Sequence, residues 1–266
     1  MVARPTPERG PPYRMADPFE DSRRKLARAD QHFAELYEKV NEYSEAQPLE
    51  KVEVPHPTMP GHQLHKIVLR RPLPHSIADI TGDIVSNLRS GLDIAAYTVA
   101  VASGCQNPKN CAFPFAGSLA QMANSLGRSK DLPPPMQSLF VGFQPYLGGD
   151  DTLWALNEMC NTDKHKMLIP VGTAVVRLGA HVGGTGYFSM PDPHTWDRQK
   201  NEMDLITFGP GSEYKCFFDF HAFVAVNEIR AVDGKSVIEV LHKMGNRVLD
   251  ILNVIEAESR RLGYIS

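Results

Sequence analysis

Apolar residues recur at helical spacing in three long stretches of the chain. Between Phe19 and Tyr43 they repeat every seven residues, with a second set three positions further on, which is the pattern of an amphipathic helix. A wide apolar face runs through residues 77–103. From Ile238 to Leu262 the spacing between successive seam positions again alternates between three and four residues. The pattern predicts a helical bundle built from residues 17–47, 74–168 and 234–263, in which the first and last helices pair.

Two other stretches have the shorter period of β-strands. Residues 49–71 place alternating apolar residues on both sides of a Pro-Thr-Met-Pro-Gly turn, which predicts a β-hairpin. Residues 170–230 are rich in branched and aromatic residues separated by Gly and Pro. We therefore expect an α+β fold in which a hairpin and an antiparallel sheet pack on the bundle. Residues 1–16 are expected to form a disordered tail, and residues 17–266 a single domain.

One predicted helix combines an apolar seam with a polar stripe. In the stretch 153–166 a stripe of three polar side chains lies beside the apolar seam. Its members, four residues apart, are Asn157, Asn161 and His165. A row of hydrogen-bonding groups beside a core seam indicates a candidate functional site.

Composition narrows the function classes. The formal net charge of -3 argues against broad, charge-driven nucleic-acid binding, although it leaves open a small basic pocket for one RNA. The longest apolar runs are far shorter than the roughly 20 residues of a membrane span, and no secretory signal is visible. We therefore expect a cytoplasmic protein without a membrane partner.

The cysteines and histidines indicate no metal site or cofactor. None of the 4 cysteines forms a Cys-x-x-Cys pair, and reduced thiols are expected, although Cys105 and Cys111 flank one loop and could approach each other. His56, His62 and His65 lie in the predicted hairpin, where intervening prolines break a regular ligand geometry.

Four motifs occur in an order that resembles a family of uncharacterised bacterial proteins. They are Phe19-Glu20-Asp21-Ser22, Asn87-Leu88-Arg89-Ser90-Gly91-Leu92-Asp93, Gln144-Pro145-Tyr146 and Asn161-Thr162-Asp163-Lys164-His165-Lys166. The second motif is similar in turn to the Arg-to-His signature of the HEPN superfamily. That resemblance implies a helical bundle, often dimeric, with metal-independent endoribonuclease activity or a non-catalytic RNA-binding role.

The resemblance also implies a set of site residues. His165 would act as the base for a 2′-hydroxyl and Arg89 as the catalytic cation, while Asn161, Lys164 and Asn157 would bind the substrate. The structural alternative is that Arg89 with Asp93, and Asp163 with Lys166, are simple ion pairs within a helix.

The sequence departs from the signature at two positions. Ile94 occupies the place of the family's histidine five residues after Arg89, and Cys160 stands five residues before His165. Whether the protein is an enzyme is therefore left open. The first hypothesis is a HEPN-like RNA-binding protein with weak or degenerate endoribonuclease character, with a homodimer through the helical seams as one option. The alternative is a non-enzymatic interaction or small-ligand-binding protein in which the motif residues are structural.

Overall fold

The computed structural model of this chain describes residues 17–162, 168–183, 186–190, 196–197 and 199–266, and its α+β class confirms the prediction. The elements are α1 (Glu20–Glu45), β1 (Leu49–Pro55), β2 (Gln63–Leu69), α2 (His75–Ala102), α3 (Met122–Ser125), α4 (Pro134–Gly142), α5 (Asp151–Asn161), β3 (Leu168–Gly183), β4 (Phe188–Ser189), β5 (Glu202–Phe208), β6 (Glu213–Val226) and α7 (Val237–Arg261). The predicted tail, residues 1–16, lies outside the described residues.

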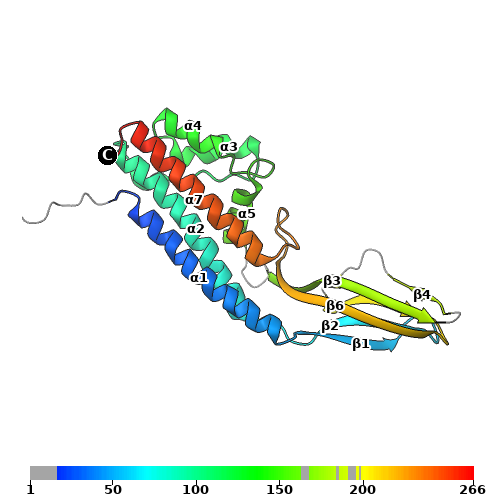
Figure 1. Ribbon diagram of the computed structural model, residues 1–266. Helices are drawn as coiled ribbons and strands as arrows, with labels where there is room; N and C mark the ends of the chain where they lie inside the picture. The colour runs from blue at the N-terminus through cyan, green and yellow to red at the C-terminus, as the bar shows by residue number, and fades with distance from the viewer. Residues whose placement is uncertain (1–16, 163–167, 184–185, 191–195, 198) are drawn as a thin grey trace, which may run out of the picture.

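The helices α1, α2 and α7 lie side by side and form most of the core (Figure 1). Their buried faces are the apolar seams that the sequence pattern predicts, and Leu36, Leu92 and Ile255 are fully buried. At Gly91 a β-carbon would lie 2.6 Å from Leu26 Cδ1, so the missing side chain lets α1 and α2 approach closely. The seams of α1 and α7 are buried within one chain, and a homodimer through the helical seams stays a prediction. That the bundle is HEPN-like stays a prediction.

The strands form a four-stranded antiparallel sheet and a separate ribbon. The predicted hairpin is present as β1 and β2, with Val54 opposite Leu64. Strand β2 also pairs with β5, and the sheet order is β1-β2-β5-β4. The hairpin therefore belongs to one sheet with strands more than a hundred residues later in the chain, which the sequence pattern did not indicate. Strands β3 and β6 make the two-stranded ribbon.

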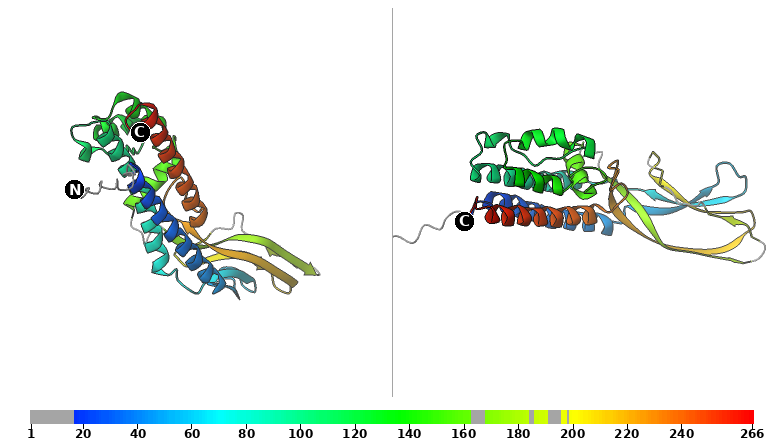
Figure 2. Two further views of the ribbon diagram at one scale, coloured as in Figure 1. Left: turned by 60° about the vertical axis from the view of Figure 1, so that its left-hand side comes forward. Right: turned by 90° about the horizontal axis from the view of Figure 1, so that it is seen from above.

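The β-elements extend from one end of the bundle instead of covering its side, as Figures 1 and 2 show. This placement differs from the expected packing of the sheet on the helices. The sheet has a buried apolar cluster of its own, which includes Ile67, Leu205 and Phe208. Its strands therefore bury apolar side chains without lying along the helix bundle.

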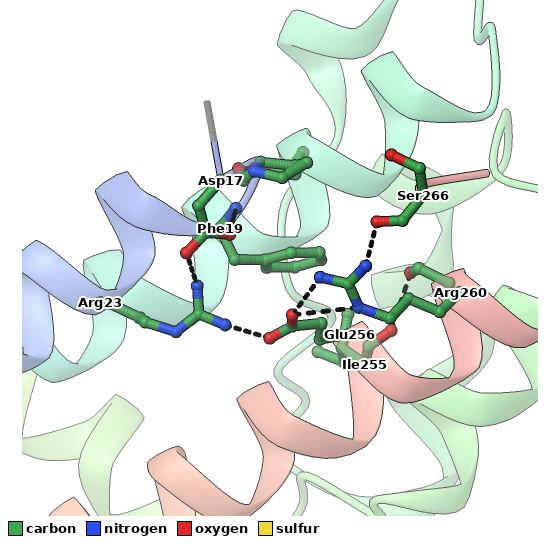
Figure 3. A network of polar contacts seen from close by, with 10 residues as sticks. Asp17, Phe19, Arg23, Ile255, Glu256, Arg260 and Ser266 are labelled. Atoms are coloured by element: carbon green, nitrogen blue, oxygen red, sulfur yellow. Dashed lines mark hydrogen bonds and ion pairs between the residues drawn. The ribbon is translucent and has the colours of Figure 1, made fainter. Parts of the chain in front are cut away.

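The two ends of the described chain meet at the other end of the bundle (Figure 3). Arg23 on α1 bonds to the carboxylates of Asp17 and Glu256. Glu256 on α7 also accepts a 2.9 Å hydrogen bond from Arg260, and Arg260 bonds to the carbonyl oxygen of Ser266. The expected pairing of the first and last helices is confirmed, and polar contacts tie their ends together.

One helix is shorter than the sequence pattern predicts. Helix α5 ends at Asn161, and Thr162 has an extended backbone with ψ 150°. The Thr162 hydroxyl donates to the carbonyl of Glu158 at 2.9 Å, so a side chain bonds to a carbonyl of the last turn. The predicted helix is therefore wrong at Thr162 and at Leu168, where β3 begins, whereas residues 163–167 lie outside the described residues.

None of the described helices combines the length and the apolar character that crossing a membrane requires.

Candidate functional site

The Arg89 side chain extends from α2 and contacts α5 and the segment that follows α2. Its Nη1 donates to Oδ1 of Asn157 on α5, and its guanidinium carbon lies 4.8 Å from the centroid of the Phe115 ring. One helical turn away on α2, Asp93 Oδ2 lies 3.9 Å from Arg89 Nε. The Arg89 side chain is 23% exposed. The guanidinium group therefore has three partners: Asn157 at one edge, the Phe115 ring on one face, and the Asp93 carboxylate.

The partners of Arg89 are themselves held by further contacts. Asp93 Oδ1 accepts a hydrogen bond from the backbone N–H of Phe113 at 3.0 Å, and Asn157 Nδ2 lies 3.3 Å from Glu158 Oε1. The Phe113 ring packs against Phe115 with centroids 5.0 Å apart. We call Arg89, Asp93, Asn157 and Phe115 the Arg89 cluster. It joins two helices and a loop that the sequence pattern could not place relative to one another.

Of the other two residues of the predicted polar stripe, Asn161 does not extend this cluster, and His165 lies outside the described residues. Asn161 is the last residue of α5, and its side chain is exposed. The predicted site residues Asp163, Lys164 and His165 lie outside the described residues. Of the predicted set, the structure therefore brings together Arg89, Asp93 and Asn157, but not Asn161.

Ile94, at the position of the family's histidine, faces a different neighbour from Arg89. Arg89 contacts α5, whereas Ile94 lines a groove between α2 and α1. Five residues correspond to about 140° around a helix, which accounts for the different directions. A histidine at position 94 would therefore lie on another face of α2 from Arg89.

The groove between α1 and α2, which we call the α1–α2 groove, is lined by three cations, an aromatic ring and the carboxylate of Asp21, which lies 3.4 Å from Arg24. Its volume is about 770 Å³, and its cations are Arg24, Lys25 and Arg28 of α1. Lys25 Nζ lies 3.4 Å from Oδ1 of Asn87, and Tyr97 is 41% exposed on the α2 wall. Sequence reasoning missed this site, although three cations within five residues of one helix were a visible signal.

A second groove, the α5–α7 groove, has a volume of about 890 Å³, and both acidic and basic side chains line it. Asp150 Oδ2 accepts a 2.6 Å hydrogen bond from Arg247 Nε across it. The loop beside it contains Gln144, whose φ of 52° lies in the left-handed region. At Gly149 a β-carbon would lie 2.6 Å from the Gln144 carbonyl oxygen, so this loop requires glycine there.

The histidines of the hairpin do not gather into a ligand set. His65 is 2% exposed, faces Glu53 at 3.6 Å and packs edge-on against the Phe208 ring. Burial lowers the pKa of His65, and the Glu53 carboxylate offsets part of that shift. Across the described part of the chain, no three His, Cys, Asp or Glu side chains are grouped as a metal site would need.

Cys105, Cys111 and Cys160 carry free thiols, so Cys105 and Cys111 are not bridged. Burial raises the pKa of the Cys111 thiol, which keeps it in the protonated, unreactive form. Cys160 Sγ lies 3.3 Å from the Val85 carbonyl oxygen, where it helps to join α5 to α2.

Comparisons of this chain with protein-family models, with curated proteins and with solved structures give no match.

Proposed function

We propose that this protein is a non-catalytic RNA-binding module that takes a single strand in the α1–α2 groove. The observation that carries the proposal is the lining of that groove, where Arg24, Lys25 and Arg28 lie opposite the exposed ring of Tyr97. Cations neutralise phosphates, and an exposed aromatic ring offers a face on which an unpaired base stacks. This pairing of residue types suits a single strand better than a duplex, whose bases are already stacked.

The Arg89 cluster supports a binding role over cleavage. Metal-independent RNA cleavage needs a cation that is free to meet the developing charge and a base near it. Arg89 is already bound to Asn157 and Asp93, and on the described part of α2 Ile94 supplies no proton carrier; His165, the predicted base, lies outside the described residues. In the proposal the Arg89 cluster holds α2 against α5, and the RNA lies on another face of α2.

The overall charge is consistent with a local site. A chain of net charge -3 has no general attraction for RNA, so the affinity rests on the few cations of the groove. On a single strand each phosphate contact contributes about -0.7 to the slope of log affinity against log salt. Contacts from two or three cations therefore predict a slope of about -1.4 to -2.1.

Fluorescence anisotropy of a short labelled oligouridylate tests the proposal. Arg24→Ala with Arg28→Ala should weaken binding and make the salt slope shallower by about 0.7 for each phosphate that is no longer neutralised. Tyr97→Ala should weaken binding by about 1–3 kcal/mol with the salt slope unchanged. A matched control removes the same charge elsewhere, with Lys39→Ala and Arg70→Ala, and should bind like the wild type. Equal weakening in the groove and control variants would place the RNA elsewhere.

Cleavage is assayed on the same oligonucleotide. The wild type should leave it intact, and Ile94→His would introduce a titratable group into the α1–α2 groove. RNA cleavage by the wild type that disappears in Arg89→Ala would overturn the non-catalytic part of the proposal.

The α5–α7 groove favours a second candidate function, a non-enzymatic interaction or small-ligand-binding protein. Its mixed charges and the strained Gln144 suit a small polar ligand. Arg89→Ala should lower the melting temperature under either candidate, so oligonucleotide binding separates them. If the wild type binds no oligonucleotide, the second candidate is favoured.

A cytoplasmic location is part of the same proposal. It is supported by the free thiols of Cys105, Cys111 and Cys160, because thiols stay reduced in that compartment.

A further inference from the structure

A third recess lies between α1, α2 and α7, on a part of the bundle that neither the RNA proposal nor the Arg89 cluster uses. Its volume is about 180 Å³. We call it the three-helix slot, and its lining consists of Leu26, Ala29, Asp30, Phe33, Ile84, Leu88, Leu241, His242, Gly245, Asn246 and Leu249.

The inner lining of the slot is apolar. Leu26, Ala29, Ile84, Leu88 and Leu241 are each no more than 8% exposed, and none carries a polar side-chain group. A cavity of roughly 150 Å³ with a Leu, Ile and Phe lining stays dry and accepts benzene. The three-helix slot is therefore large enough for one aromatic ring, and its inner surface offers water no hydrogen-bond partner.

Gly245 accounts for the opening of the slot on α7. A β-carbon built at Gly245 meets no atom within 4 Å, so the position faces open space and not a packed neighbour. Glycine in a helix interior costs about 1 kcal/mol relative to alanine. Tight packing does not require glycine at this position, in contrast to Gly91, where a β-carbon would lie 2.6 Å from Leu26 Cδ1.

The mouth of the slot carries polar groups of defined character. Asp30, His242 and Asn246 are exposed lining residues, and the His242 ring lies 6.1 Å from the Phe33 ring. Among the described residues, none of the ion pairs involves Asp30. An unpaired carboxylate that lines the same recess as the Phe33 ring favours a positively charged group at the mouth.

From these observations we infer that the three-helix slot binds a small amine whose apolar part is about the size of one aromatic ring. The ring enters between α1, α2 and α7, and the ammonium group remains at the mouth, where it pairs with the Asp30 carboxylate. Asn246 offers a further oxygen acceptor to the same group. This inference is independent of RNA binding, because the slot shares no residue with the α1–α2 groove.

Chemical-shift perturbation with benzylamine tests the inference, at pH 8, where histidine side chains are mostly neutral. The shifts should saturate and map to the facing turns of α1, α2 and α7. Benzoate has the same ring with the opposite charge and should bind at least tenfold more weakly, while benzyl alcohol should fall between the two. Equal binding of benzoate and benzylamine would refute the role of Asp30.

Variants of Gly245 and Asp30 locate the ligand. Gly245→Leu should abolish benzylamine binding by filling the slot, and Gly245→Ala should weaken it while raising the melting temperature. Gly142→Ala is the matched control, since a β-carbon there also meets nothing within 4 Å and Gly142 lies outside the slot. Asp30→Asn should bring the affinities for benzylamine and benzyl alcohol together. Benzylamine shifts that persist unchanged in both Gly245 variants would overturn the inference.

Discussion

At the scale of single residues, Arg89 illustrates how a motif residue can have a structural role. A guanidinium group offers a planar fork of donors and an aromatic-like face, and Asn157 and Phe115 occupy an edge and a face. Hydrogen bonds to charged groups contribute more to stability than bonds between neutral groups. The contacts of Arg89 therefore join α2 to α5 and to the loop that carries Phe115.

A double-mutant cycle measures this role. We expect Arg89→Ala and Asn157→Ala each to lower the free energy of unfolding by about 1.5–3 kcal/mol, because each removes a charge-assisted hydrogen bond. The double variant should lose less than the sum of the two, with a coupling energy of about 0.5–3 kcal/mol in urea unfolding. Arg89→Lys should not restore stability, because an ammonium group lacks the planar fork.

Arg24→Ala is the control for the cycle. Its side chain is 75% exposed on α1, so its removal should change the unfolding free energy by less than about 0.5 kcal/mol. Additive effects at Arg89 and Asn157 would contradict the direct contact.

At the scale of elements, the start and the end of α5 depend on polar side chains. Asp150 caps the helix by accepting from the N–H groups of Thr152 and Leu153 at 3.0 and 3.1 Å. The same carboxylate pairs with Arg247 of α7 at 2.6 Å. One residue therefore begins α5 and joins it to α7, while Thr162 bonds to a carbonyl in the last turn.

Two substitutions at Asp150 separate the cap from the ion pair. Asp150→Asn should keep most of the cap and lose the charge, since asparagine caps helices as well as aspartate does. Asp150→Ala should lose both, with about 1 kcal/mol more destabilisation for the cap. Thermal or urea unfolding measures each step.

Arg247→Ala provides the comparison for these variants. If the cap and the ion pair act separately, Arg247→Ala should match Asp150→Asn in stability, because both remove the same pair. A destabilisation in Asp150→Asn as large as that in Asp150→Ala would contradict the role of the cap.

At the scale of the whole molecule, the two ends of the described chain stabilise each other across the bundle. Glu256 accepts from Arg23 of α1 and from Arg260 of its own helix, and its side chain is 15% exposed. Because both arginines donate to this carboxylate, it connects the first turn of α1 to the last turns of α7.

Glu256→Ala should therefore loosen both ends together. We expect a lower melting temperature and faster amide hydrogen exchange in the first turn of α1 and at the end of α7. Glu258→Ala is the matched control, because Glu258 pairs with Arg261 only within its own helix. Faster exchange at α7 alone in Glu256→Ala would show that the contact with Arg23 carries no stability.

The helices were largely predictable because their periodicity is a local property. The seams of α1, α2 and α7 are present as expected, since burying an apolar stripe determines which face of each helix points inward. The end of α5 was not predictable from periodicity, because the apolar pattern continues past Asn161 while the backbone of Thr162 is extended.

The candidate site was predictable only in part. Motif order pointed to Arg89 and Asp93, the polar stripe pointed to Asn157, and the structure brings these three together. Their contacts with one another, and the placement of Ile94 on a different face of α2, follow from how α2 packs against α5 and α1. No sequence spacing specifies that packing.

By itself the sequence determined the α+β class, the three long helices and the β-hairpin, since each depends on contacts between residues close along the chain. Only the tertiary structure decided that the hairpin joins β5 in one sheet, that the strands extend beyond the bundle and that Arg89 meets Asn157. These features depend on burying apolar surface between segments far apart in the sequence. A local period indicates which faces are apolar, but it does not say which faces meet.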